Sequence, residues 1–417
     1  DNADSFFERG VLDQHYTYSY LYGIQETIKN NRATASNIIW DGVMGLCAAI
    51  KQSGEKNLFE REKRERNSFD TWLVGWDGVH STMTDVLQEL LTERDGSVRI
   101  DFSIYRDRIF AILGYLLSYP DPSPADEQIE TATRKTKSSG DGDYMVKDPL
   151  HIAINSVRGR AYQAFALFLY QDGKKFKKED RIKIGTDVKK LYESILKKES
   201  TRALMFMFGH YLLTFYFRDR NWVRGLLPQI FPQEPAKKHL YTAAWEGYIT
   251  NNLYEEMFFD PKIQKIYERC LALTNTDYPE QKHFKEPNEC IAEHLALAFM
   301  YYKKFGFDHP LFNAFWKKND TDQHAHFISF IGRLFISGSN ANTDKVLKKL
   351  ESKKRLKDLW DWTLEHYDDP KLFVKFGFWI NLEKGIFEPP WLAERVKKTL
   401  GKTKGALDWD CGLVESI

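Results

Sequence analysis

Residues 148–170 read DPLHIAINSVRGRAYQAFALFLY, and this stretch decides the fold class. Asp148 is a favourable N-cap, and Pro149 suits the first helical position, where its missing N–H costs nothing. From there the apolar residues recur at spacings of three and four, which is the pattern of one amphipathic helix. We therefore predict a single helix over 149–171 that includes the polar run 155–160.

The polar run carries three residues that we interpret as a structural motif, Asn155, Arg158 and Gly159. Asn155 and Arg158 share a stripe at the border between core and solvent. Because a desolvated charge without partners is costly, we expect Arg158 to bind a carboxylate or the carbonyls that end a neighbouring helix. Glycine costs about 1 kcal/mol relative to alanine inside a helix, so Gly159 indicates that a neighbour approaches closely. Arg160 lies on a different face and is the better candidate for a contact with solvent or a partner.

Helical periodicity continues along nearly the whole chain, and alternating strand patterns are scarce. The fold class that we predict is all-α, a superhelical array of antiparallel helix pairs resembling a TPR-like or HEAT-like α-solenoid. Short polar turns such as 219–221 and 368–370 favour antiparallel neighbours, although no strict repeat is present. The expected helices span 14–30, 35–52, 68–93, 101–119, 149–171, 178–198, 201–218, 236–258, 261–274, 288–305, 321–337, 343–367 and 371–381.

One segment interrupts the helical pattern. Residues 120–147 are rich in Pro, Ser, Thr, Gly and charge and offer little to bury. We interpret them as a mobile polar loop, or else an interdomain linker, between N-terminal helical repeats (1–119) and C-terminal helical repeats (148–417). The sequence begins without Met and ends in what resembles the first turns of another helix, so we expect a piece of a longer protein.

Composition excludes several classes of function. The 417 residues contain 60 Lys and Arg against 59 Asp and Glu, a net charge of +1. This balance does not favour a dedicated nucleic-acid or membrane binder, which should be basic. The longest apolar run, 204–217, is too short for the roughly 20 residues that a bilayer requires. The four cysteines form neither a metal motif nor a disulfide framework, which favours a cytoplasmic protein.

Motifs for catalysis and cofactors are missing from the sequence. It contains no phosphate loop, no G-x-S-x-G and no H-E-x-x-H motif, so we expect no cofactor and no catalytic residue in this chain. His324 and His326, with Asp322, are the candidate metal ligands. Residues two apart on a helix point about 200° from one another, so ordinary surface histidines are favoured over a metal site.

Two carboxylate pairs, Glu255–Glu256 and Asp368–Asp369, are candidates for an acid and a base. Such a pair would suit an α-toroid enzyme acting on a carbohydrate or isoprenoid-like substrate. Their positions at expected helix starts favour a structural role, since Asp369 precedes Pro370 as an N-cap would.

Aromatic residues are abundant, with 29 Phe, 21 Tyr and 11 Trp. Most of these rings are expected in the core. Trp360 and Trp362, two residues apart on one helix, need not both point inward. Since exposed Trp is typical of protein interfaces, Trp360 and Trp362 are candidates for a contact with a partner.

Three stretches carry a family resemblance: 155–161 (NSVRGRA), 215–232, which begins FYFRDRNW and ends LLPQIFP, and 241–258, which begins YTAAWEGYI and ends LYEEMF. Together they resemble the C-terminal helical-repeat region of bacterial antiviral STAND-type NTPases. The resemblance extends from about residue 148 to the end. It implies that the motif residues, with Trp245, belong to the scaffold.

In that family the repeats act as the sensor, and an effector and an NTPase module precede them. The resemblance therefore implies that this chain is a sensor fragment without enzymatic activity. It would bind a phage protein, the large terminase subunit or the portal, and so trigger assembly into tetramers, with no direct contact to nucleic acid. Two alternatives remain open at this point, the α-toroid enzyme and a plain helical scaffold.

Overall fold

A computed structural model of the chain describes residues 13–30, 37–55, 75–93, 100–125, 127, 148–173, 183–274, 277–278, 282, 285–318, 320–336, 350–380 and 386–403. Over these ranges the chain is helical, and no strand occurs within them. The prediction of an all-α protein is confirmed. In the same ranges, no helix combines the length and the apolar character needed to cross a membrane.

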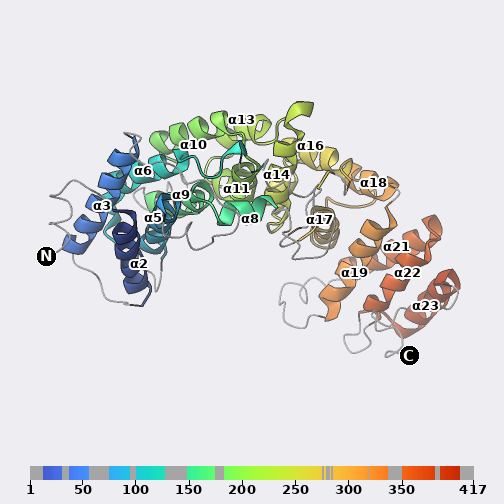
Figure 1. Cartoon of the computed structure of the whole chain (residues 1–417). Coiled ribbons are helices and arrows are strands. Elements are labelled where there is room, and N and C mark those ends of the chain that lie inside the picture. The colour runs from blue at the N-terminus through green and yellow to red at the C-terminus, as the bar shows by residue number, and fades with distance from the viewer. Residues whose placement is uncertain are drawn as a thin grey trace, which may run out of the picture. The chain divides into compact units, whose positions relative to one another are not determined.

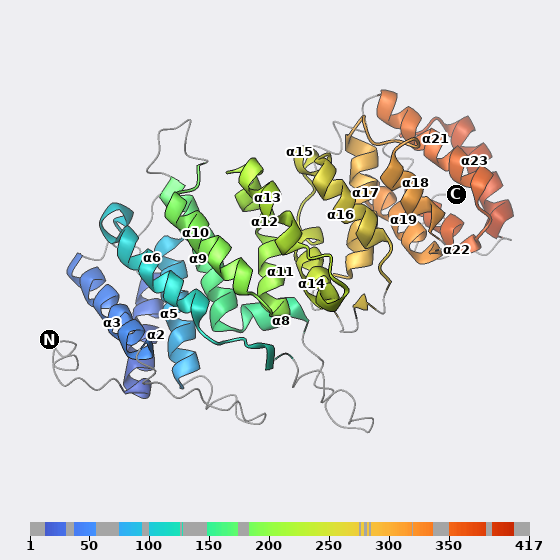
Figure 2. The ribbon, with the colours of Figure 1, turned by 90° about the horizontal axis from the view of Figure 1, so that it is seen from above.

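The chain divides into two compact units. Unit 1 comprises residues 1–248 and 280–283, and unit 2 comprises residues 249–279 and 284–417. The boundary therefore falls inside the predicted C-terminal part, 148–417, and not at 120–147. Helices from the predicted N-terminal part, 1–119, share unit 1 with helices that follow residue 148 (Figure 1 and Figure 2).

The helices of unit 1 alternate between two layers. They are α2 (Gln14–Asn30), α3 (Asn37–Glu55), α5 (Trp76–Leu91), α6 (Phe102–Ser118), α8 (Pro149–Ile154), α9 (Val157–Gly173), α10 (Thr186–Lys198), α11 (Arg202–His210), α12 (Leu212–Tyr216), α13 (Arg220–Ile230), the 3-10 helix η2 (Pro235–Lys237) and α14 (Lys238–Ile249). In one layer α3, α6, α10 and α13 contact one another in that order, and in the other α2, α5, α9 and α11 do so. Figure 1 shows the first layer along the upper side of the unit.

Unit 2 repeats this alternation. Its helices are α15 (Glu255–Phe258), α16 (Pro261–Leu271), α17 (Pro287–Tyr301), α18 (Pro310–Lys317), α19 (Thr321–Ile336), α21 (Leu350–His366), α22 (Pro370–Phe373), the 3-10 helix η4 (Val374–Trp379) and α23 (Pro389–Thr403). α16 contacts α18, α17 contacts α19, and α21 contacts α23, while α19 also packs on α22 and η4. In each unit the arrangement is compatible with an α-solenoid.

Aspartate N-caps start many of these helices. The carboxylates of Asp101, Asp148, Asp219, Asp260 and Asp369 each accept a hydrogen bond from a backbone N–H in the first turn of the helix that follows. Proline occupies the first helical position after three of them, at Pro149, Pro261 and Pro370. These local signals explain why the predicted helix starts at 101, 149, 261 and 371 agree closely with the structure.

The single helix predicted over 149–171 is wrong, because the chain breaks it at Asn155 and Ser156 into α8 and α9. The Asn155 amide donates to the carbonyl of His151 at 2.8 Å, and the Ser156 hydroxyl donates to that of Ala153 at 3.1 Å. Short polar side chains that bond the preceding turn in this way compete with helix continuation.

Other predicted helices also differ from the structure. The helix predicted over 201–218 is interrupted at Tyr211, and that over 236–258 ends at Ile249 before α15 begins. Helices α13, α18 and α23 were not predicted. The turn predicted at 219–221 is the start of α13, where Asp219 accepts the Trp222 N–H at 3.0 Å.

The described start of segment 120–147 is packed on unit 1, so the loop prediction does not hold there. Asp121 is fully buried, and its carboxylate accepts the Val157 N–H at 2.9 Å. The Glu127 carboxylate accepts the N–H groups of Arg202 and Ala203, each at 2.9 Å, at the start of α11. Residues 128–147, on which most of that prediction rests, lie outside the described ranges.

Candidate functional site

The sequence motif lies at the junction of α8, α9 and α6, where Arg158 joins three backbone or side-chain acceptors. Its Nε donates to the carbonyl of Leu117 in the last turn of α6, and its Nη1 to that of Pro122, both at 3.2 Å. Its Nη2 pairs with the carboxylate of Glu199, whose side chain is only 1% exposed. The contacts predicted for Arg158, a carboxylate and helix-ending carbonyls, are confirmed.

The partner carboxylate is itself fully engaged. The second oxygen of Glu199 accepts the N–H groups of Ser200 at 3.0 Å and Thr201 at 2.8 Å, and the Thr201 hydroxyl at 2.6 Å. Glu199 therefore links the chain just before α11 to the α9 arginine. This arrangement supports a structural role for Arg158.

Gly159 admits a close neighbour, but that neighbour is the chain's own preceding helix. A Cβ atom at Gly159 would lie 2.0 Å from the carbonyl oxygen of Ala153 in α8. The close approach predicted at Gly159 is therefore confirmed, and the neighbour is α8, which had been predicted to form one helix with α9. Trp245, the fourth scaffold residue, lies apart from this junction in α14 and is fully buried, its ring 5.6 Å from that of Tyr248.

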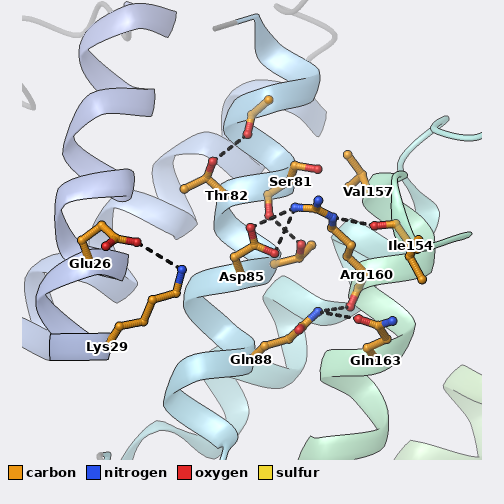
Figure 3. Close-up of polar contacts among 12 residues, drawn as sticks. Glu26, Lys29, Ser81, Thr82, Asp85, Gln88, Ile154, Val157, Arg160 and Gln163 are labelled. Carbon is orange, nitrogen blue, oxygen red and sulfur yellow. Dashed lines mark hydrogen bonds and ion pairs between the residues drawn. The ribbon is translucent and has the colours of Figure 1, made fainter. Parts of the chain in front are cut away.

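Arg160 was expected to contact solvent or a partner, and its side chain, 26% exposed, also binds two neighbouring groups of the chain. Its Nη1 donates to both oxygens of Asp85 in α5, at 2.9 and 3.1 Å, and its Nε to the carbonyl of Ile154 at 2.9 Å (Figure 3). Its own carbonyl accepts the Gln88 side chain at 2.9 Å. Burial raises the pKa of Asp85, and the Arg160 charge opposes that rise. Arg160 therefore joins α5 to α9.

The two candidate tryptophans of unit 2 have different environments. Trp360 is fully buried, and its indole N–H donates to the hydroxyl of Thr399 at 3.0 Å, so its assignment as a partner contact is wrong. Trp362 is half-buried. Its ring stacks on that of His366 at 4.8 Å and meets that of Trp316 edge to face at 5.1 Å.

The candidate metal ligands do not face one another. His324 is buried, stacks on the Trp316 ring at 4.5 Å and bonds the carbonyl of Phe315 at 3.0 Å, so it is not a surface histidine. His326 instead meets the carboxylate of Glu293 at 3.3 Å. Within the residues that the structure describes, no group of ligands suited to a metal ion is found.

Both candidate carboxylate pairs lie at helix starts. Asp369 accepts the Lys371 N–H at 3.0 Å and the Thr321 hydroxyl at 2.8 Å, while Asp368 pairs with Lys402. Glu255 and Glu256 occupy the exposed first turn of α15. Each pair has the helix-end position that the sequence favoured.

Two other histidines, one in each unit, are buried and neutral, and sequence patterns did not indicate them. The Nδ1–H of His80 donates to the Trp76 carbonyl at 2.6 Å, which leaves Nε2 to accept the Tyr115 hydroxyl at 2.7 Å. The Nε2–H of His294 donates to the Asn251 carbonyl at 2.8 Å, and its Nδ1 accepts the Tyr267 hydroxyl at 2.6 Å. Burial is the main cause that lowers the pKa of each ring to about 4.

We expect these two histidines to make the protein sensitive to acid. Each pKa is depressed from 6.5 to about 4, so the associated stability is present above pH 6.5 and is lost as the pH falls toward 4. At pH 5 the loss is about 2 kcal/mol for each ring. Urea denaturation at pH 7 and pH 5 measures this loss of unfolding free energy. In His294→Gln the loss should be smaller by about 2 kcal/mol.

His15→Gln is the control. His15 is exposed, so its replacement should not change the loss of unfolding free energy between pH 7 and pH 5. If His294→Gln and His80→Gln each lose as much unfolding free energy between pH 7 and pH 5 as the wild type, the acid sensitivity does not come from these rings.

Cationic side chains recur at the ends of helices, in the same role as Arg158. Each donates to a carbonyl 35 to 53 residues earlier in the chain, at or just beyond a helix C-terminus. These are Lys318 to Leu273 at 3.0 Å, Arg355 to Tyr302 at 3.1 Å and Lys402 to Tyr367 at 3.0 Å. Cations are favoured at helix C-termini by the helix dipole. Side chains of later helices thereby bond the C-terminal ends of earlier helices.

Exposed aromatic rings gather in two places of unit 1, which the sequence did not indicate. Tyr16, Tyr20 and Tyr22 of α2 are 66%, 44% and 48% exposed. Tyr170, near the end of α9, is 49% exposed, and Phe217, at the end of α12, is 41% exposed. Within the described part of unit 1, these rings form the exposed aromatic surface, whereas Trp360 of unit 2 is buried.

Comparisons of the chain with protein-family models, with curated proteins and with solved structures found no match.

Proposed function

We propose that this chain is a protein-recognition region, the sensor of an antiphage STAND-type NTPase of the bacterial cytoplasm. It binds a folded phage protein, the large terminase subunit or the portal. In the full-length protein this binding promotes tetramer assembly and activates the effector.

The observation that carries the proposal is the alternation of helices between two layers, with helix ends bonded to side chains about one helix pair further along the chain. This is the nearest-neighbour construction of helical-repeat proteins, which bind other proteins on extended surfaces. Recognition of a whole folded protein requires an interface of about 1,600 Å² in total, which a helical array supplies.

The use of the polar groups also supports binding over catalysis. Arg158, Arg160 and Glu199 all hold backbone or side-chain groups of neighbouring helices. The buried histidines His80 and His294 likewise bond two partners each. These groups act as fixed connections of a scaffold.

A binding assay tests the proposal. The 417-residue chain, immobilised through a tag, is exposed to purified large terminase subunits and portals from a panel of phages. We expect at least one of them to be retained, with no retention on an unrelated helical-repeat protein immobilised in the same way.

Failure to retain any of these proteins would contradict the proposal if the chain is folded. Circular dichroism and a cooperative urea transition establish that condition. Retention of a protein other than a terminase or portal would preserve protein recognition and overturn the phage assignment.

A further inference from the structure

Two carboxylates of one short segment that follows α6 cap the starts of two different helices. The Asp121 carboxylate accepts the first N–H of α9 at 2.9 Å. The Glu127 carboxylate accepts the N–H groups of Arg202 and Ala203 in the first turn of α11, each at 2.9 Å. Helices α9 and α11 contact one another in one layer of unit 1. We call this segment, of which residues 121–125 and 127 are described, the strap.

The Asp121 end of the strap is held by several buried groups. Asp121 is fully buried, and its carbonyl accepts the Arg158 N–H at 2.8 Å. Arg158 also binds the strap through its side chain, because its Nη1 donates to the Pro122 carbonyl at 3.2 Å. The same guanidinium pairs with the buried Glu199. Since these groups connect α6, α9 and the chain before α11, we expect this end to open only when unit 1 unfolds.

The Glu127 end supplies a cap that the local sequence of α11 does not. Thr201 precedes α11, but its hydroxyl donates to Glu199 at 2.6 Å, and its side chain makes no cap bond to the helix. The first N–H groups of a helix have no acceptor within the helix. Glu127 provides one from 75 residues earlier in the chain. The cap of α11 therefore depends on where the strap lies.

The Glu127 carboxylate is held against a cost of desolvation. Burial raises the pKa of Glu127, and the nearby charge of Glu199 adds to this rise. The bonds from the N–H groups of α11 and the charge of Arg202 lower the pKa, but the net direction is upward. A carboxylate with a raised pKa is less stable in its site, as an anion, than it is in water. Ionised Glu127 is therefore the weaker end of the strap.

We propose that the strap is a two-state device of unit 1, with a fixed end at Asp121 and an end at Glu127 that detaches while the unit stays folded. In the closed state the first turn of α11 is capped, and in the open state it is not. Local openings of this kind require less free energy than global unfolding. The inference goes beyond the proposed function and does not depend on it, because it concerns unit 1 without any partner.

Native-state hydrogen exchange tests the strap, because each end bonds backbone amides that can be followed separately. The amides at the fixed end are Val157 and Arg158, and those at the other end are Arg202 and Ala203. Exchange of the 417-residue chain is measured at several low urea concentrations, residue by residue, by mass spectrometry. We expect exchange at the fixed end to accelerate steeply with urea, as unfolding does, and exchange at the other end to be faster and nearly independent of urea.

Variants show whether Glu127 is responsible. Glu127→Ala should speed the exchange of Arg202 and Ala203 by about tenfold, the factor that corresponds to loss of a typical helix cap. The amides at the fixed end should keep most of their protection. Glu127→Gln keeps one acceptor oxygen without the charge and should give a smaller increase. Glu26→Ala is the control and should change neither end, because Glu26 forms an exposed pair with Lys29.

Equal urea dependence of exchange at the two ends would overturn the inference, since the strap would then open only together with unit 1. Unchanged exchange of Arg202 and Ala203 in Glu127→Ala would also overturn it, because the start of α11 would then open without any contribution from Glu127. Circular dichroism and urea midpoints establish that each variant is folded. The outcome is separate from that of the phage panel, because the exchange experiment contains no phage protein.

Discussion

Alanine at Gly209 or Gly247 is expected to destabilise unit 1 by about 3 kcal/mol or more, near the upper end of overpacking effects. A Cβ at Gly209 would lie 1.9 Å from the carbonyl oxygen of Ala244 in α14, and a Cβ at Gly247 would lie 2.0 Å from that of Phe206 in α11. Both clashes are with main chain, which no change of rotamer relieves. Helices α11 and α14 therefore pack backbone against backbone, and either methyl group must push them apart.

Urea denaturation of the two variants measures this effect, and Gly225→Ala is the matched control. Gly225 is an exposed position of α13. A Cβ atom added there would have no heavy atom within 4 Å apart from its chain neighbours and the backbone of its own helix. Alanine there should stabilise the helix by up to about 1 kcal/mol, the difference in helix propensity. If the urea midpoints of Gly209→Ala and Gly247→Ala equal that of the wild type, α11 and α14 lie further apart than described.

The sequence predicted the all-α class and the long amphipathic helices, because their signal is local. Helices α2, α3 and α19 agree with their predicted ranges to within a few residues. Each keeps its apolar residues on one face over four or more turns, and that periodicity is readable without knowledge of neighbours.

The break between α8 and α9 could not be predicted from periodicity. The apolar stripe continues across it, since residues on both sides face the same core. The break is stabilised by Asp121, whose carboxylate binds the Val157 N–H and whose carbonyl binds the Arg158 N–H from more than 30 residues away. A cap supplied by a distant segment leaves no local signal.

Which side chains at the border between core and solvent are buried could be predicted only in part. For Arg158 the helix position and the adjacent glycine indicated a buried partner. The direction of Arg160 depends on Asp85, 75 residues earlier, and the burial of Trp360 depends on helix α23, which was not predicted. Phe217 belongs to a run that is apolar on nearly every side, yet it lies at the end of α12, where the run becomes exposed.

Arg158→Ala is expected to lower the free energy of unfolding by about 3 kcal/mol, because truncation leaves the buried Glu199 carboxylate without its cation. It also removes donors from the carbonyls of Leu117 and Pro122. Arg158→Lys keeps the charge but cannot reach three acceptors from one planar group, so we expect it to recover only part of the loss. Glu199→Gln should likewise destabilise unit 1.

Urea denaturation and the partner-binding assay, run on the same proteins, separate a structural from a recognition role. Arg108→Ala is the control for charge removal, because Arg108 and Asp41 form an exposed pair, each 59% exposed, and such pairs contribute at most about 1 kcal/mol. If Arg158 is structural, its alanine variant loses stability far beyond this control, and binding falls only where unit 1 unfolds. Unchanged stability with lost binding would instead place Arg158 in the recognition surface, since a side chain holding α6, α9 and Glu199 together cannot be removed without cost to the fold.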